Sequence, residues 1–430
     1  MTFKKLTSVI LIIFTLLSLC SCKPEEAEIN TEAAVETSAP EAAKLTFIDN
    51  GKTDFKIIRS EDAEGYYLDT ARIVYRKLKE EFSPDFKQAE DWINPLEPDP
   101  TAAHELLLFN TNRAESAAAV AELKIPGYII RVTDCKIVIA GSGITQCNAA
   151  LNEFFYKIIP ENTQNGTTSF PIGLEVKREL ADTAFDFGAA ISAGKGIGAH
   201  ITEVFKYSGR DGFSSSQGAT SDGKYVYIAT KKKDGGTETD KIVKVDAETW
   251  EIVKVSEELY LDHANDMTYD TARGQLAVVN MVGGVISFIE TENLTVTKAP
   301  SHPFFTSAIE YIEENGQYLL RAGNGFIYTD GDLNQLSYHE VNGYPAELDK
   351  YTGQGMYADT SYLYIPRSPT AGFSDNVIIV CDSEGNYLTT VTLATKMESE
   401  TIFTIGKKFY VSFNKSCNVI CEMEFYEVFE

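Results

Sequence analysis

A repeat of about 46 residues in the second half of the chain constrains its fold more than any other feature of the sequence. The segment QGATSDGKYVYIA, which begins at Gln217, shares six residues at identical offsets with QGMYADTSYLYIP, which begins at Gln354. The two segments lie 137 residues apart, which is three repeats. Related segments begin at Asn265, Ser307 and Glu400, so the chain holds five copies. Self-similarity at a fixed period is the signature of a repeat architecture.

Each copy reads as two strands joined by a polar turn, followed by a third and a fourth strand. Four antiparallel strands in about 40–45 residues are typical of a propeller blade. We therefore predict an α+β fold with two domains: a small α/β domain, then an all-β propeller of about five four-stranded blades over residues 201–430. Because the last copy ends after about three strands, we expect HITEVFKYS (200–208) to supply its outer strand and close the ring. A β-sandwich is the alternative, although it gives no reason for the period.

The N-terminus predicts secretion and lipidation. Two lysines precede about fourteen mostly apolar residues and then LCSC (19–22), an order typical of a bacterial lipoprotein signal. The apolar run is shorter than the ~20 residues that span a bilayer. We predict a signal peptide with a lipobox over residues 1–22, lipidation at Cys22, and a location on the extracellular face of the cell membrane; an ordinary signal peptide is the alternative. Residues 23–44 are rich in Ala, Glu, Thr and Pro, so we expect a disordered acidic stalk.

Residues 45–180 mix helical and strand patterns and predict an α/β module. Helical spacing over 68–82 follows the strand-like FKIIRS, and HELLLFN (104–110) reads as a buried strand. Asn112 stands three residues before a glutamate, the spacing of a capping box, ahead of an Ala-rich helix. GYIIRVTD and CKIVIAGSG predict a β-hairpin, and CNAALNEFFYKII (147–159) predicts an amphipathic helix.

Two resemblances follow from these segments. The run ELLLFNTNRAES…GYIIRVTDCKIVIAGSG…ALNEFFYKII, over roughly 105–160, resembles the non-catalytic N-terminal α/β domain of α-glucuronidases and related glycoside hydrolases. That resemblance implies a polysaccharide setting but not hydrolysis, because the catalytic carboxylates of that family lie on a barrel and no (β/α)₈ pattern follows here. The stretch HANDMTYDTARGQLAVVN, with the repeats around it, resembles propeller-like secreted proteins of Gram-positive anaerobes, which implies a surface location and no settled activity.

The composition limits the partners of the chain. Its formal net charge is −25, and loss of Lys4 and Lys5 with the signal peptide makes it −27. Such acidity argues against nucleic acid or anionic lipid as a partner, so the only membrane contact we expect is the lipid anchor. The five histidines are scattered and form no zinc motif. The GxGxG run in 181–200 lacks the context of a nucleotide loop, so we predict a flexible linker there and neither cofactor nor metal.

The cysteines do not form a complete disulfide framework, because an odd number remains beyond the anchor. A single bridge between Cys135 and Cys147 is one alternative, and buried thiols are the other, which we favour. Cys417 and Cys421 lie about 13 Å apart along one strand, too far to bond to each other. The five cysteines concerned are Cys135, Cys147, Cys381, Cys417 and Cys421.

The aligned starts of the innermost strands predict a ligand-binding site at one mouth of the propeller. They would place amides, hydroxyls and carboxylates around the channel, and such groups suit sugar hydroxyls, which both donate and accept. The alternative is that these groups hydrogen-bond neighbouring blades. We assign no catalytic residue, although His263, Asp266 and Glu400 could form an acid–base set. The candidate ligand-binding residues are Gln217, His263, Asn265, Asp266, Ser307, Gln354 and Glu400.

Other residues on the same strands have simpler expected roles. Gly218 and Gly355 would allow close packing near the axis. Asp222, Asp270 and Asp359 would shape the turns that follow the first strands, with calcium binding as the less favoured interpretation.

The leading functional hypothesis is a surface lipoprotein that binds an extracellular glycan or another cell-envelope ligand through the propeller mouth. We consider a binding protein better supported than an enzyme. The alternatives are a glycan hydrolase or lyase acting from the same channel, and a protein-interaction scaffold.

Overall fold

The computed structural model describes residues 43–93, 102–123, 126–181, 185–209, 212–234, 237–280, 284–370, 375–414 and 417–430. Residues 43–430 form a single unit. The predicted signal peptide and almost all of the predicted stalk, Cys22 included, lie outside the described residues.

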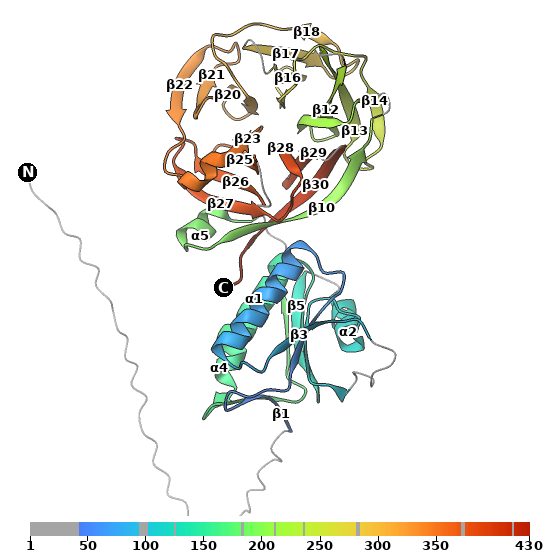
Figure 1. The fold of residues 1–430 in the computed structure, drawn as a ribbon, viewed down its shortest axis with the longest axis vertical. Helices are drawn as coiled ribbons and strands as arrows, with labels where there is room; N and C mark the ends of the chain where they lie inside the picture. Colours follow the sequence, from blue (N-terminus) through green and yellow to red (C-terminus); the bar gives the residue numbers. More distant parts are fainter. Residues whose placement is uncertain are drawn as a thin grey trace, which may run out of the picture. The chain divides into compact units, whose positions relative to one another are not determined.

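The N-terminal part of the described chain contains a six-stranded sheet and its helices (Figure 1). Its elements in chain order are β1 (Lys44–Asp49), β2 (Lys56–Arg59), α1 (Gly65–Glu81), β3 (Lys87–Glu90), β4 (Glu105–Leu108), α2 (Ala114–Glu122), β5 (Gly127–Val132), β6 (Lys136–Gly141), α3 (Ile144–Glu153), a π-helical turn (Phe154–Ile158), α4 (Ile159–Glu161), β7 (Thr163–Gln164), β8 (Thr167–Pro171) and β9 (Glu175–Glu179).

The six-stranded sheet has the order β3-β2-β4-β6-β5-β9, and β1, β7 and β8 form a separate small sheet. Strands β3, β2, β4 and β6 pair parallel with one another, whereas β5 pairs antiparallel with both β6 and β9. Helices α1 and α3 pack on one face of the sheet and α2 on the other. Covering both faces explains why β4 reads as an unbroken apolar run: Leu106 and Leu107 are buried on opposite sides.

The predicted hairpin is confirmed as the antiparallel pair β5–β6, but two helix starts differ from the prediction. The residue before α2 is Arg113, without a capping side chain, where we expected Asn112 to cap. The side-chain oxygen of Asn112 instead accepts a hydrogen bond of 2.7 Å from Arg113 Nη1. Helix α3 begins at Ile144, three residues before the predicted start, and passes into the π-helical turn.

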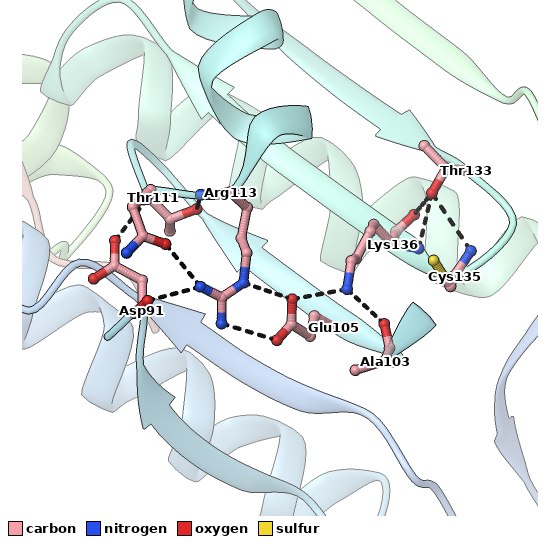
Figure 2. Close-up of polar contacts among 9 residues, drawn as sticks. Asp91, Ala103, Glu105, Thr111, Arg113, Thr133, Cys135 and Lys136 are labelled. Carbon is pink, nitrogen blue, oxygen red and sulfur yellow. Dashed lines mark hydrogen bonds and ion pairs between the residues drawn. The ribbon is translucent and has the colours of Figure 1, made fainter. Parts of the chain in front are cut away.

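A buried cluster of charges joins β4, β6 and the start of α2 (Figure 2). Glu105 accepts from Arg113 Nε at 3.0 Å and Nη2 at 3.1 Å, and from Lys136 Nζ at 2.9 Å. Lys136 also donates to the Ala103 carbonyl, and Arg113 donates to the carbonyl of Asp91. The side chains of Glu105, Lys136 and Arg113 are almost fully buried, so the carboxylate is the counter-ion of two cations away from water.

Strands predominate in the second part of the described chain. In chain order it comprises α5 (Phe187–Ser192), β10 (Ile197–Tyr207), β11 (Ser215–Ser221), β12 (Tyr225–Asp234), β13 (Thr237–Asp246), β14 (Ile252–Val255), β15 (Asp266–Asp270), β16 (Gln275–Asn280), β17 (Val285–Glu290), β18 (Val296–Lys298), β19 (Ala308–Ile312), β20 (Gln317–Ala322), β21 (Gly325–Thr329), β22 (Gln335–Glu340), the 3₁₀ turn (Ala346–Lys350), β23 (Tyr351–Gly353), β24 (Tyr357–Ala358), β25 (Tyr362–Pro369), β26 (Asn376–Asp382), β27 (Tyr387–Leu393), β28 (Glu398–Ile405), β29 (Lys408–Asn414) and β30 (Asn418–Glu427).

These strands form a propeller-like β domain. Strands β11–β14, β15–β18 and β19–β22 are three four-stranded antiparallel sheets. The remaining strands form one nine-stranded sheet, in which β10 joins β27 to β30. Figure 1 shows the sheets around a common centre, with β14, β18 and β22 on the outer rim.

The acid at the end of the third strand, which recurs in four copies, shapes the turn to the fourth strand. Asp246 Oδ1 accepts from the backbone N–H of Glu248 and Thr249. Glu290, Asp330 and Asp382 accept from the backbone in the same way. These bonds supply acceptors to the backbone N–H groups of the turn, which lie outside the pairing between strands. This explains the acid at that position of the repeat.

Strand β10 closes the last sheet. It pairs antiparallel with β30 over most of its length, which confirms the strand predicted at 200–208, and three of its residues pair parallel with β27. The prediction of a flexible linker over 181–200 is wrong in part, because α5 and the start of β10 lie within that range. The side chain of Asp186 caps α5, and Phe187 packs against Tyr364 and Phe425.

The structure supports our expectation of buried thiols rather than a disulfide bridge. Cys147, Cys381 and Cys421 are buried thiols, so the bridge left open between Cys135 and Cys147 is not formed. Burial raises the pKa of Cys381 and of Cys421 to about 12, which keeps both protonated and unreactive near neutral pH.

Candidate ligand-binding site

The first strands of the propeller-like sheets meet around the common centre. β11 contacts β15, β15 contacts β19, β19 contacts β24, and β24 contacts β28. Since β28 also contacts β11, these strands form a closed ring. The two ends of this ring are the places where a ligand could reach the axis.

Asp266, one of the predicted ligand-binding residues, ties this ring together from within. Its Oδ2 accepts from the backbone N–H of Ile309 at 3.0 Å and of Met356 at 3.2 Å, and its Oδ1 accepts from the Thr401 hydroxyl at 2.7 Å. The residue is fully buried, and burial raises its pKa to about 7. With no exposed surface, Asp266 contacts protein groups on three other strands rather than a ligand.

The two inner-strand glycines have the role that we predicted. A Cβ on Gly218 would lie 2.6 Å from the Cα of Asp266, and one on Gly355 would lie 2.6 Å from Asp266 Oδ1. Real Cβ atoms do not approach other atoms so closely, so both positions require glycine for the strands to meet at the axis.

Three more predicted residues begin inner strands, and two of them bond to their neighbours. The Asn265 side chain donates to the Ser307 carbonyl of the next sheet, and the Gln217 amide donates to the Ser216 carbonyl and Ser215 Oγ. Asn265 and Gln217 are buried, whereas Ser307 keeps part of its surface. The alternative that these groups hydrogen-bond neighbouring blades therefore describes Asn265, whereas the Gln217 amide bonds to residues of its own strand.

The remaining predicted residues, Gln354, Glu400 and His263, form two polar groups at the same strand starts. Gln354 Nε2 donates to Glu398 Oε1 at 2.9 Å. Burial, with the nearby charge of Glu398, raises the pKa of the buried Glu400 to about 8. His263 lies 2.8 Å from Lys231 Nζ and 3.0 Å from Glu238 Oε2.

The other ends of the same strands surround a cavity of about 290 Å³. Every strand of the ring contributes to its wall, and the lining is rich in hydroxyls and carboxyls. One residue from each strand is Thr220, Thr268, Glu310, Tyr357 and Thr404. We take this axial cavity as the stronger candidate site, because it combines open volume with groups that the five strands position together.

Glu310 is the functional candidate that sequence reasoning missed. Its Oε1 accepts from the Thr268 hydroxyl at 2.9 Å and from the Tyr311 N–H at 3.2 Å. Burial, together with the charge of Asp266, raises its pKa well above the ordinary value. The repeat held a usable signal: Glu310 is the fourth residue of its copy, where two other copies carry Thr220 and Thr268.

The rims of the cavity carry the turn aspartates. Asp222 Oδ1 accepts from the N–H of Lys224 and Tyr225, and Asp359 Oδ1 accepts from the N–H of Ser361 and Tyr362. This confirms the turn role predicted for both. Within the described residues, no group of three or more His, Cys, Asp or Glu side chains is arranged to hold a metal ion. Among the same residues, no helix has the length and apolar character needed to cross a bilayer.

Comparison with protein families finds no match, and comparison with curated proteins finds none either. Among solved structures, the glutaminyl cyclase of Myxococcus xanthus is similar over 55% of this chain and 99% of its own, at 14% identity and a TM-score of 0.42. Virginiamycin B lyase of Staphylococcus aureus matches 53% of this chain and 99% of its own, at 12% identity and a TM-score of 0.30.

An exported protein of Bacteroides fragilis matches 53% of this chain and 96% of its own, at 8% identity and a TM-score of 0.33. At these scores we draw nothing about fold or function from the likeness. The resemblances to α-glucuronidase modules and to surface proteins of Gram-positive anaerobes therefore stay predictions.

Proposed function

We propose that the chain is a lipid-anchored surface protein that binds an extracellular glycan at the axis of a closed, five-bladed propeller, carried on a separate α/β domain and a stalk. The observation that carries this proposal is the axial cavity of about 290 Å³, to which all the inner strands contribute. Closure of the strand ring from β28 to β11 supports the five-bladed arrangement. The anchor rests on Cys22 and its lipobox, in the part of the chain outside the described residues.

The lining of the cavity fits a sugar. Thr220 and Thr404 offer hydroxyls that both donate and accept, which is what sugar hydroxyls require. Tyr269 and Tyr311 add aromatic rings with polar tips. Among the described residues that line the wall, the ionisable groups are carboxyls and tyrosines, so the cavity favours neutral or amino sugars over sulfated or uronic acid chains.

The experiment is a glycan-array and calorimetric comparison of the two ends of the ring. Wild type is compared with Thr220→Val/Tyr311→Phe, which removes polar atoms from the axial cavity, and with Asn265→Ala/Gln354→Ala at the strand starts. We expect a neutral or amino glycan to bind wild type and to lose at least about tenfold affinity in the first variant, which corresponds to 1.4 kcal/mol.

Loss in the second variant alone would move the site to the strand starts, where Gln354, Ser307 and His263 keep part of their surface. Absence of binding to any glycan on the array would refute the proposal. Thermal melting of each variant separates a lost contact from a lost fold.

A second candidate function is glycan cleavage in the same cavity. The specific observation in its favour is Glu310, a carboxyl on the cavity wall whose pKa is raised by burial and by the charge of Asp266, a shift that favours the protonated form that a general acid uses. Under this alternative, Glu310→Gln would retain glycan binding and abolish product release, as measured by mass spectrometry. If wild type releases no product from a glycan that it binds, cleavage is excluded for that glycan.

A further inference from the structure

A second cavity lies away from the axial cavity, between the six-stranded sheet and β10. Its volume is about 690 Å³, within the range of about 300–1,000 Å³ that small-molecule sites occupy. The ends of β2, β4 and β6 form one wall through Arg59, Leu108 and Gly141, and residues 200–203 of β10 form another. Because these three strands are parallel, the cavity lies at their carboxyl ends, where open α/β sheets bind ligands.

An aromatic group lines this junction cavity. The ring of Tyr67 meets Phe109 edge to face at 5.5 Å and meets His200 at 5.8 Å. Phe109 adopts a left-handed backbone conformation with φ of 65°, which is uncommon for an aromatic residue and clusters at functional sites. Aromatic rings attract cations by their negative faces, so this wall favours an organic cation over an anion.

Carboxylates line the cavity, and their negative charge suits a cationic ligand. Asp62, Glu64 and Glu203 line it, and none of these carboxylates forms an ion pair or a side-chain hydrogen bond with another described residue. The one guanidinium, that of Arg59, is paired with Glu90 at 2.6 Å.

The ring of His200 adds no positive charge to this wall. Its Nδ1 accepts from the Tyr66 N–H at 3.4 Å, which places any ring proton on Nε2. Burial lowers the pKa of His200, so the ring is neutral at neutral pH. Among the described residues that line the cavity, no cation is therefore available to pair with the three carboxylates.

We propose that the junction cavity is a second binding site, which takes a small organic cation: an amine or quaternary ammonium with an apolar body. The apolar body would contact Leu108, Phe109 and Val120, and the charged group would lie between the Tyr67 ring and the carboxylates of Glu64 and Glu203. The inference does not depend on glycan binding at the axis.

The test uses the full-length chain and four probes: choline, its neutral carbon analogue, n-butylamine and n-butanol. We expect isothermal titration to show that at least one cationic probe binds about tenfold or more tightly than its neutral partner. Tyr67→Leu and the double variant Glu64→Gln/Glu203→Gln should each weaken that probe by about 2- to 30-fold, as expected for removing a cation–π or charge contact.

Tyr260→Leu serves as the matched control, because Tyr260 is exposed and lies outside the cavity. The carboxylate variants change exposed side chains, so they report on the site even where Tyr67→Leu fails to fold. Equal binding of charged and neutral probes, no binding of either cation, or affinity unchanged in the carboxylate variant would each overturn the proposal. Glycan binding at the axis should be the same in all these variants, which keeps the two proposals distinguishable.

Discussion

Replacing Asp266 by asparagine should leave the fold stable and remove much of its dependence on pH. The Asp266 carboxyl accepts two buried backbone N–H groups on Oδ2 and the Thr401 hydroxyl on Oδ1. An asparagine can keep all three bonds, with its oxygen at the Oδ2 position and its amide donating to the Thr401 oxygen. Alanine cannot, and it would leave the N–H groups of Ile309 and Met356 buried without acceptors. At about 1–3 kcal/mol for each of these two unsatisfied groups, Asp266→Ala should cost about 2–6 kcal/mol.

The sign of the pH effect follows from the raised pKa of Asp266. A carboxyl with a pKa of about 7 in the native state and about 3.9 when unfolded binds its proton more tightly in the native protein. Its stabilising contribution is fully present below about pH 4 and is lost as pH rises through about 7, by about 4 kcal/mol in total. About 3 kcal/mol of this loss falls between about pH 5 and pH 8.

Urea denaturation followed by circular dichroism at those two pH values measures the effect. Wild type should lose about 3 kcal/mol more than Asp266→Asn across the interval. Glu310 and Glu400, whose pKa values are also raised, are present in both proteins and largely cancel in the comparison. The reasoning fails if the two proteins show the same pH slope, or if Asp266→Asn is as unstable as Asp266→Ala.

Three further predictions follow from the packing and from the anchor. Glu105→Gln should cost about 3–5 kcal/mol in chemical denaturation, because it removes the buried negative charge that lies between the guanidinium of Arg113 and the ammonium of Lys136; the exposed Glu122→Gln should destabilise the fold far less. Gly355→Ala should lower the melting temperature markedly, since the new Cβ would lie 2.6 Å from Asp266 Oδ1, whereas Gly196→Ala, with its nearest neighbour at 3.4 Å, should change little; equal melting temperatures would contradict the close packing at the axis. Cys22→Ala should move the chain from the membrane fraction to the soluble fraction of bacterial cells, and an unchanged distribution would rule out lipidation at that residue.

The sequence by itself determined most of the strand pattern. The 46-residue period placed the paired strands, because each copy must alternate apolar and polar residues to bury one face against its neighbour. It also predicted the closing strand, since a last copy short of one strand would leave an open edge. The turn role of Asp222 and Asp359 could be predicted from the sequence because the interaction is local. Each carboxylate accepts hydrogen bonds from the N–H groups two and three residues ahead.

Only the tertiary structure decided which polar residues are available to a ligand. Gln217, Asn265 and Asp266 look like a ring of ligand groups in the aligned repeats, yet all three are buried in the structure. Asn265 and Asp266 bond to partners as far as 135 residues away, and the Gln217 amide bonds within its own strand. Glu310 lies on an equivalent inner strand but lines the axial cavity. The junction cavity is formed by strand ends that lie far apart in the sequence and share no local sequence pattern. Hydrogen-bond partners and open volume depend on how distant strands pack, whereas periodicity records only which face of each strand is buried.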